Sequence, residues 1–219
     1  MWLKKLTMPS IADIRKEYIM QTLLENDVDA DPMLQFGKWW DEVLRSDIDE
    51  ANAMTLATAT ADGTPSARIV LLKEYNDTGL VFFTNYKSRK GSELDENPQA
   101  SLVFFWKELE RQVRICGTVE KVSTAASDAY FSSRPQESQL GAWASEQSTV
   151  IAGRSVIEER SEKYQRQFGE NIPRPDWWGG YLVRPKTIEF WQGRPGRLHD
   201  RILYSLQEDG GWKVERLAP

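Results

Sequence analysis

The sequence predicts an α+β protein with an antiparallel β-barrel core and helices packed outside it. Three observations support this expectation. Segments of alternating or apolar β-type residues follow one another through the middle of the chain, the links between them are short and rich in turn residues, and helix-type patterns flank and interrupt them. The sequence contains neither the glycine-rich turn of a dinucleotide-binding sheet nor a P-loop, so nucleotide binding by either design is not expected.

The first part of the chain is predicted to be an N-terminal arm with one helix, residues 1–30, ahead of a single domain, residues 31–219. The segment Ser10-Ile11-Ala12-Asp13 has the form of a capping box, and apolar residues recur after it at helical spacing. A second helix is expected after Asp31-Pro32, with an apolar side formed by Leu34, Trp39, Val43 and Leu44.

Strands are expected from residue 54 onward. Residues 54–60 alternate, and the turn residues 61–64 link them to the next strand, which predicts a strand, a turn and a strand. Further strands are predicted over residues 68–73, 79–84, 100–106 and 111–122. Residues 75–79 are interpreted as a polar connection. Sequential strands with hairpin-length links are typical of an antiparallel meander or barrel.

Helices alternate with strands in the rest of the chain. Ser88 is a plausible N-cap for a helix that follows it. Further helices are predicted over residues 124–134, after Pro135, and over residues 155–168, the last with a capping box at Ser155 and Glu158 and an end at Gly169. Strands are then predicted over residues 180–184, 188–191, 200–206 and 212–217.

Composition excludes several classes of protein. The net charge of -5 provides no overall basic field, so a nucleic-acid partner is not expected. One cysteine and one histidine supply neither a disulfide framework nor a ligand set for zinc, and no metal is predicted. Neither a signal peptide nor a membrane-spanning run is recognisable, which predicts a cytoplasmic protein without a membrane partner. Redox chemistry would therefore require a bound cofactor.

The only histidine lies in the most informative stretch of the chain, residues 189–201. Arg197, His199 and Arg201 are two residues apart, so on a strand they share one face. Cationic or protonatable groups near an aromatic residue such as Trp191 suit a flat anionic ligand. The alternative is a solvated strand face.

Three other basic clusters suggest phosphate binding. Arg89 and Lys90 follow the Ser88 N-cap, where a helix N-terminus attracts anions; the alternative is a solvated basic turn. Arg68 and Lys73 are five apart, so they face opposite sides of a strand and suit two different anions. A third cluster, alternatively a surface pair with a capping serine, comprises Tyr130, Arg134 and Ser138.

Taken together, these motifs resemble those of a known family. They are RIVLLK at 68–73, FFTN at 82–85, SRK at 88–90, ERQV at 110–113, YFSSRP at 130–135, SQLGA at 138–142, QS at 147–148, WGG at 178–180, the stretch 189–201 and ERLAP at 215–219. In this order, from about Ile11 to the last residue, the chain resembles the pyridoxine/pyridoxamine 5′-phosphate oxidase family. That resemblance implies a homodimer of FMN-binding split β-barrels, with two flavins at the subunit interface and residues 31–219 as the split-barrel domain.

The resemblance also implies a division of the site residues. FMN would be held by Arg68, Ile69, Val70, Leu71, Lys73, Phe83, Thr84, Arg89, Lys90, Gln112, Gln147, Ser148, Trp191 and Arg201, some of them from the second subunit. Some relatives carry tyrosine at the position of Phe83. The substrate phosphate would be held by Lys73, Tyr130, Arg134 and Ser138. Arg197 and His199 would bind the pyridine ring as the catalytic pair, and Arg15 and Tyr18 would belong to a lid over the substrate.

The implied reaction oxidises pyridoxine 5′-phosphate or pyridoxamine 5′-phosphate to pyridoxal 5′-phosphate by hydride transfer from C4′ to flavin N5. Dioxygen is the electron acceptor, hydrogen peroxide is released, and the amine also yields ammonia. Three alternatives stay open: a split-barrel FMN reductase acting on another heterocycle, a non-catalytic pyridoxal-phosphate carrier, and a binder of single-stranded nucleic acid. The reductase has no reason to combine Tyr130, Arg134 and Ser138 with Arg197 and His199.

Overall fold

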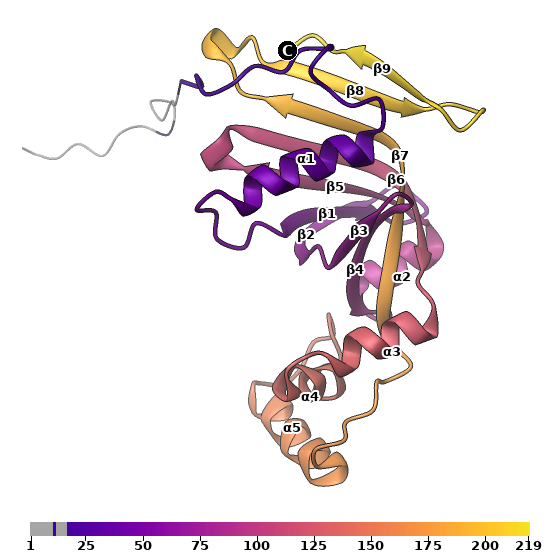
Figure 1. Ribbon diagram of the computed structural model, residues 1–219. Helices are drawn as coiled ribbons and strands as arrows, with labels where there is room; N and C mark the ends of the chain where they lie inside the picture. Colours follow the sequence, from indigo (N-terminus) through magenta and orange to yellow (C-terminus); the bar gives the residue numbers. More distant parts are fainter. Residues whose placement is uncertain (1–10, 12–16) are drawn as a thin grey trace, which may run out of the picture.

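The computed structural model describes Ile11 and residues 17–219. In these residues, five α-helices accompany one nine-stranded antiparallel sheet. The helices are α1 (Pro32–Leu44), α2 (Arg89–Glu96), α3 (Thr124–Ser132), α4 (Gln136–Ala144) and α5 (Ser155–Phe168). The strands are β1 (Ala53–Ala59), β2 (Pro65–Leu71), β3 (Glu74–Asn76), β4 (Gly79–Asn85), β5 (Gln99–Trp106), β6 (Arg111–Lys121), β7 (Trp178–Gln192), β8 (Asp200–Leu206) and β9 (Trp212–Arg216). The expected α+β class, with a curled antiparallel sheet, is confirmed (Figure 1).

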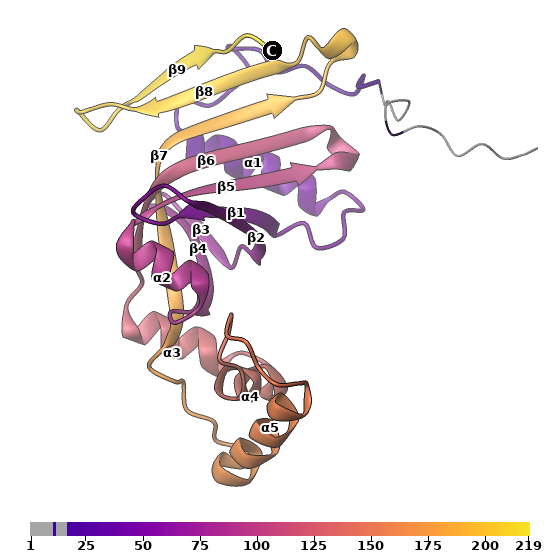
Figure 2. The same ribbon diagram turned by 180° about the vertical axis from the view of Figure 1, so that it is seen from behind.

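The sheet runs in the order β2-β1-β5-β6-β7-β4-β3, and β8 and β9 continue it from the second half of β7. It is not a simple meander, because β1 pairs with β5 and β4 pairs with β7. The long strand β7 joins two parts of the molecule, since its first half pairs with β4 and its second half with β8. Helix α1 lies against the sheet, whereas α3, α4 and α5 project beyond one end as an arm (Figures 1 and 2).

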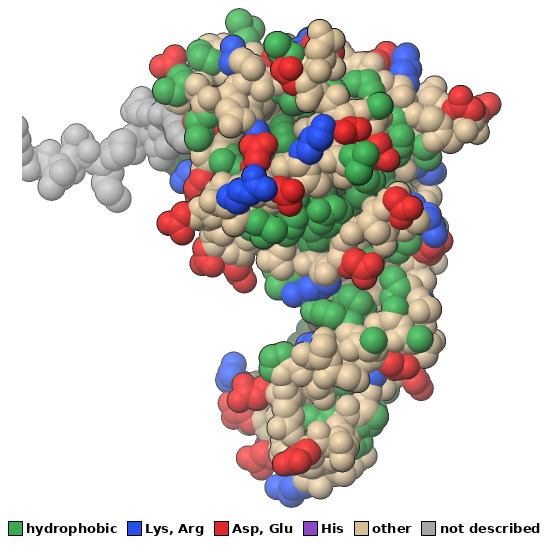
Figure 3. Space-filling model, viewed as in Figure 1, with side chains coloured by type: hydrophobic (Ala, Val, Ile, Leu, Met, Phe, Trp, Pro, Cys, Tyr) green, Lys and Arg blue, Asp and Glu red, His purple; other side chains and the backbone are tan. Residues whose placement is uncertain are grey.

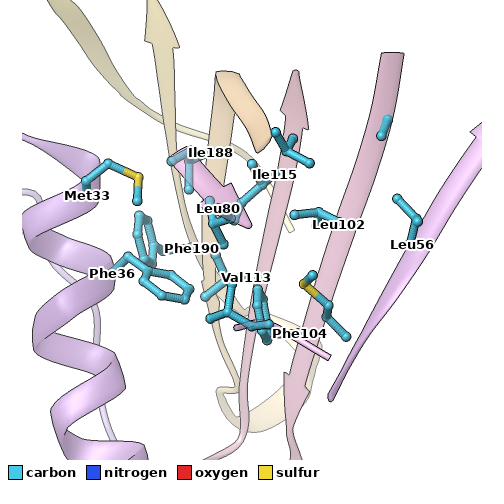
Figure 4. Packing of buried hydrophobic residues seen from close by; sticks show 14 of the residues in the cluster. Met33, Phe36, Leu56, Leu80, Leu102, Phe104, Val113, Ile115, Ile188 and Phe190 are labelled. Atoms are coloured by element: carbon cyan, nitrogen blue, oxygen red, sulfur yellow. The ribbon is translucent and has the colours of Figure 1, made fainter. Parts of the chain in front are cut away.

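The main core lies between α1 and the strands (Figure 4). Helix α1 begins where Pro32 follows the N-cap Asp31, whose side chain accepts a hydrogen bond from the amide of Met33. It buries Phe36 and Trp39 against inward-facing strand residues such as Phe104 and Phe190. The burial of β1 alternates strictly, as expected for a strand with one face on the core. A smaller cluster around Phe131, Leu140 and Trp178 holds the arm together.

Replacing Phe36 by alanine is expected to lower the free energy of unfolding by about 3–5 kcal/mol, the usual cost of truncating a buried aromatic residue. Phe36 is fully buried and contacts Tyr75, Phe104 and Trp106, with ring centroids 5.0 to 6.1 Å away. The measurement is urea denaturation. Leu34→Ala on the same helix is the control, because Leu34 is 60% exposed; equal losses for the two variants would contradict the packing described here.

Four sequence-based expectations need correction. Residues 74–76 form the short strand β3, which pairs with β4, where only a polar connection was expected. The two strands predicted over 180–184 and 188–191 are one continuous strand, β7. The register between β6 and β7 shifts where Cys116 faces Thr187 and Gly117 faces Pro185, so Lys186 is an extra residue on β7 and the strand passes its proline unbroken.

The third correction concerns residues 197–199, which do not lie on a strand. Arg197 ends a short 3-10 turn, Pro195–Arg197, with a φ of 63°, and β8 begins only at Asp200. The fourth is the capping box at Ser155, which does not form, because Arg154 is the N-cap and pairs with Glu158. Ser10, where the first helix was predicted to begin, and Arg15 lie outside the described residues.

The segment before α1, residues 17–31, lies across the C-terminal strands. The amides of residues 19 and 20 donate to the Glu110 carboxylate at 2.9 and 3.1 Å, just before β6. Further along, the amide of Leu23 donates to Asp200 at the start of β8, and Arg216 on β9 binds Glu25. These contacts hold Tyr18 beside β7 and β8. Among the described residues, no helix combines the length and the apolar character needed to cross a membrane.

Candidate functional site

A cationic cavity of about 530 Å³, here called the anion cavity, lies where β2 and β4 meet the start of α2 and the loop after α4. Ten of the residues predicted to hold a cofactor line it: Arg68, Ile69, Val70, Leu71, Phe83, Thr84, Arg89, Lys90, Gln147 and Ser148. Its lining contains three cationic side chains and no acidic one. The space-filling view shows the molecule hollowed between the sheet and the arm (Figure 3). Its volume lies in the range of small-molecule sites.

Lys90 is the most unusual residue of the anion cavity, since a cationic side chain is only 7% exposed there. Its Nζ donates to the hydroxyls of Thr84 and Ser88 at 3.2 and 3.3 Å. Burial lowers the pKa of Lys90, the Arg68 charge lowers it further, and Glu93 partly opposes both. Because a buried ammonium group normally has an anionic partner, this arrangement favours an anion in the cavity.

The start of α2 contributes a second attraction for anions. Ser88 is the N-cap, as predicted, and its Oγ accepts a hydrogen bond from the amide of Gly91. The N-terminus of a helix carries a partial positive charge and unpaired amide groups. Arg89 and Lys90 occupy its first turn, so helix and side chains suit the same phosphate-like group.

Phe83 also lines a second cavity of about 510 Å³, whose charged lining residues are Lys73, Lys121, Glu74 and Glu120. It brings together the predicted residues Lys73 and Tyr130, with the Lys73 Nζ 6.0 Å from the Tyr130 ring centroid. The Phe83 and Tyr130 rings are stacked with centroids 4.0 Å apart. The expectation that Arg68 and Lys73 serve different sites agrees with this geometry.

The other two predicted substrate residues, Arg134 and Ser138, do not line this second cavity. The Arg134 guanidinium stacks over Trp178 at 4.5 Å, and Trp178 in turn stacks on Phe83. Its Nη1 is buried and finds no hydrogen-bond partner among the described residues, which again favours an anionic ligand. Ser138 lies in the first turn of α4 and lines neither cavity.

The third group surrounds the only histidine. The His199 ring lies 4.6 Å from Trp191 and 5.9 Å from Tyr18, centroid to centroid. Its Nδ1 accepts a hydrogen bond from the amide of Arg194 at 3.1 Å, so the neutral ring carries its hydrogen on Nε2. Burial and the neighbouring Arg197 charge lower the pKa of His199 and favour that neutral form. Arg197 itself is exposed at the surface.

Arg201 and Gln112 belong to the same region, because both lie opposite Trp191 in the sheet. Arg201 donates to the buried Glu189 carboxylate at 2.8 Å and to the carbonyl of Ala218 at 2.8 Å. Within one chain this group is remote from the anion cavity. Thr84, which lines the anion cavity, pairs with Gly179 on β7. Trp191 lies twelve residues further along the same strand, and this number of residues spans about 40 Å at the usual rise.

Sequence reasoning overlooked two buried glutamates that hold the arginines. Glu93 binds Arg68 and Arg89, and Glu189 binds Arg114 and Arg201. The signal for Glu93 was present, because it lies four residues after Arg89, the spacing of a helical ion pair. The Glu189 pairs join three neighbouring strands, so no local spacing reveals them.

Comparisons with known proteins agree with this geometry. A family model described as pyridoxamine 5′-phosphate oxidase matches residues 40–168, and one described as the pyridoxine 5′-phosphate oxidase C-terminal dimerisation region matches residues 178–219. The chain is 57% identical over 211 residues to a pyridoxine/pyridoxamine 5′-phosphate oxidase of Nostoc sp., covering 96% of this chain and 99% of that protein. It is 56% identical over 212 residues to one of Cupriavidus pinatubonensis, covering 97% and 100%.

Solved structures show the same fold. The structure of PhzG from Burkholderia lata 383 in complex with tetrahydrophenazine-1-carboxylic acid has a TM-score of 0.85 and 29% identity, covering 91% of this chain and 99% of that one. A pyridoxamine 5′-phosphate oxidase-related, FMN-binding protein from Nostoc punctiforme has a TM-score of 0.67 and covers 83% of this chain and 96% of its own. At 19% identity, the second likeness concerns the fold alone.

Proposed function

Because this chain belongs to the pyridoxamine 5′-phosphate oxidase family, we propose that it oxidises pyridoxine 5′-phosphate and pyridoxamine 5′-phosphate to pyridoxal 5′-phosphate with FMN as its cofactor. One observation carries the proposal: Phe83 lines two cavities, a cationic one and a second one where Lys73 meets Tyr130. A phosphorylated cofactor and its substrate need two sites next to each other, each with a cationic side chain for a phosphate.

The anion cavity fits the phosphate end of FMN. Lys90 is buried and donates to the hydroxyls of Thr84 and Ser88, and the first turn of α2 lines the same cavity through Arg89 and Lys90. We assign the phosphate to Lys90, Arg68 and Arg89, and the ribityl chain to Thr84 and Ser148. The backbone of residues 69–71 would line the flavin ring. When bound, FMN supplies a two-electron acceptor that dioxygen reoxidises with release of hydrogen peroxide, and the imine formed from the amine substrate hydrolyses to release ammonia.

The second cavity is assigned to the substrate phosphate. Lys73 and Tyr130 line it, and Arg134, stacked over Trp178, offers an unused donor in its buried Nη1. Ser138, at the start of α4, is assigned to the same phosphate as predicted. Binding the phosphate at one end of the substrate orients the pyridine ring at the other end, so the energy of phosphate binding helps to position the reacting carbon.

His199 and Arg197 are assigned to the pyridine ring. With Nδ1 held by the Arg194 amide, the neutral His199 ring presents an Nε2 hydrogen to donate. It is therefore suited to hold and orient a polar atom of the substrate. Arg197 adds positive charge next to it, and the Tyr18 ring makes an edge contact with the histidine ring. Arg15 belongs to the same proposed lid and lies outside the described residues.

The site is proposed to form between two subunits of a homodimer. Arg201, Gln112 and Trp191 lie far along β7 from the anion cavity of their own chain. They therefore reach a flavin in that cavity if a partner chain supplies them. The dimerisation region matched by the C-terminal family model, residues 178–219, contains Trp191, His199 and Arg201.

A second candidate function follows from the PhzG structure, whose ligand is a heterocyclic carboxylic acid without phosphate. The identity of 56–57% to curated oxidases over nearly the whole chain, together with Lys73 and Tyr130 at the second cavity and Arg134 over Trp178, favours the phosphorylated substrates.

Substrate competition tests the proposal. The FMN-loaded protein is incubated with pyridoxine 5′-phosphate, unphosphorylated pyridoxine or tetrahydrophenazine-1-carboxylic acid, and formation of product and hydrogen peroxide is measured. We expect pyridoxal 5′-phosphate from the first compound, with a kcat/KM at least 100-fold above that for pyridoxine, since two charge-assisted contacts are lost without the phosphate. Equal rates with and without the phosphate, or preferential oxidation of the phenazine acid, would contradict it.

A further inference from the structure

Glu93 occupies the centre of the cationic group beside the anion cavity. It lies on α2, and its side chain is only 3% exposed. One carboxylate oxygen accepts from Arg89 Nε at 2.8 Å, and the other accepts from Arg68 Nη2 at 3.2 Å and from the hydroxyls of Thr58 and Ser66 at 2.5 and 2.6 Å. One buried carboxylate therefore connects α2, β1 and β2.

Glu93 stays charged under all ordinary conditions. Burial raises the pKa of its carboxyl, but the hydrogen bonds from Ser66, Thr58, Arg89 and Arg68 outweigh burial and lower the pKa to about 2. Three cations surround this single carboxylate, which leaves a formal charge of +2 (three minus one) from Arg68, Arg89, Lys90 and Glu93. A phosphate monoester carries a charge close to −2 at neutral pH, so the two charges match.

The two arginines are held differently. Arg68 also bonds through Nη1 to Thr58 and through Nη2 to Ser66, so its whole guanidinium is fixed. Arg89 is bound to Glu93 through Nε, and its terminal nitrogens have no hydrogen bond to another described residue. An arginine held by Nε alone keeps its outer edge available for a phosphate oxygen.

We propose that Glu93 is a positioning residue for the cofactor phosphate, acting by holding Arg68 and Arg89 in the orientation that binds it. This inference rests on the proposed assignment of the anion cavity to FMN. It makes a prediction opposite to that of simple electrostatics. Removing a negative charge next to a phosphate site would by itself tighten phosphate binding, whereas releasing the two arginines weakens it.

The test is the Glu93→Gln variant, measured by the dissociation constants of FMN and riboflavin from quenching of flavin fluorescence in the apoprotein. Riboflavin lacks the phosphate, so the ratio of the two constants isolates the phosphate contribution. We expect FMN binding to weaken at least tenfold, about 1.4 kcal/mol, while riboflavin binding stays within about twofold. Tighter FMN binding would show that Glu93 only reduces the charge, and parallel weakening of both flavins would show a merely structural role; either result overturns the proposal.

Two further variants keep the test decisive. Glu93→Asp retains the charge on a side chain one methylene shorter, which cannot reach both arginines, so the same loss of FMN preference is expected even if the glutamine variant fails to fold. Glu42→Gln is the control, because Glu42 also binds a buried arginine, Arg111, and neither residue belongs to a proposed site. It should leave the ratio unchanged. If the unmodified protein binds neither flavin, the proposed function fails instead, and binding of inorganic phosphate to the same variants still tests Glu93.

Discussion

Replacing His199 by alanine is expected to reduce turnover of pyridoxine 5′-phosphate by about 10²-fold or more and to leave FMN bound. The ring rests against Trp191 and is oriented by the Arg194 amide, far along the chain from the anion cavity. Its loss removes the donor assigned to the substrate without touching the phosphate site. Stopped-flow reduction of the bound flavin, alongside the flavin content of the purified variant, measures both effects.

A conservative variant and a neighbouring residue serve as controls for His199. His199→Gln retains an amide donor and should recover part of the activity, whereas Leu198→Ala, at a side chain that is 72% exposed, should change little. The lowered pKa of His199 also predicts how the activity depends on pH. The neutral ring persists below the usual histidine pKa of about 6.5, so kcat/KM should fall only at more acidic pH. A colourless, flavin-free His199→Ala protein would place the residue in cofactor binding instead.

Replacing Lys90 by alanine is expected to weaken FMN binding by about 10- to 100-fold, the range for losing a charge-assisted contact. Lys90 is buried at the anion cavity, and its hydrogen-bond partners are the hydroxyls of Thr84 and Ser88. An added phosphate is therefore the natural counter-charge for it. Flavin retention after dialysis and the FMN dissociation constant of the apoprotein provide the measurements.

Lys87 offers a matched control for Lys90. It lies three residues earlier and carries the same charge, but it is exposed and lies over Trp177 at 4.9 Å. Lys87→Ala should retain FMN like the unmodified protein. In the flavin-loaded fraction of Lys90→Ala, the KM for substrate should change less than the FMN affinity does. A larger change in KM than in FMN affinity would show that Lys90 binds the substrate phosphate and not the FMN phosphate.

Local patterns predicted most of the elements, because those elements depend on local chemistry. The helix after Asp31-Pro32, the N-cap at Ser88 and the end of α5 at Gly169 were expected and are confirmed. The strand β3 was missed, since three residues next to an Asn-Asp-Thr-Gly turn carry too little alternation. The strand β7 continues past Pro185 because its pairing with β6 shifts by one residue at Lys186, and such a shift depends on the neighbouring strand.

The sequence brought together many residues of the anion cavity but not the distance between the two groups of the site. Residue types alone pointed to Arg68, Arg89 and Lys90, because a phosphate site requires cations and a helix start, and the family resemblance added the other seven predicted residues that line the cavity. The strand geometry assigned to Arg197 and His199 was wrong, because Pro195 and Gly196 form a turn there. The separation of Trp191 from Thr84 depends on strand pairing across the sheet, which spacing along the chain does not encode.

The central claim is that a flavin in the anion cavity accepts electrons from a phosphorylated pyridoxine. The most direct measurement is the visible spectrum of the FMN-loaded protein, recorded without oxygen before and after addition of pyridoxine 5′-phosphate, and again after admission of air. We predict that the flavin band bleaches with substrate and returns with oxygen, with one pyridoxal 5′-phosphate formed per flavin reduced. A flavin band that the substrate leaves unchanged, or a protein that binds no FMN when it is supplied, would contradict the account.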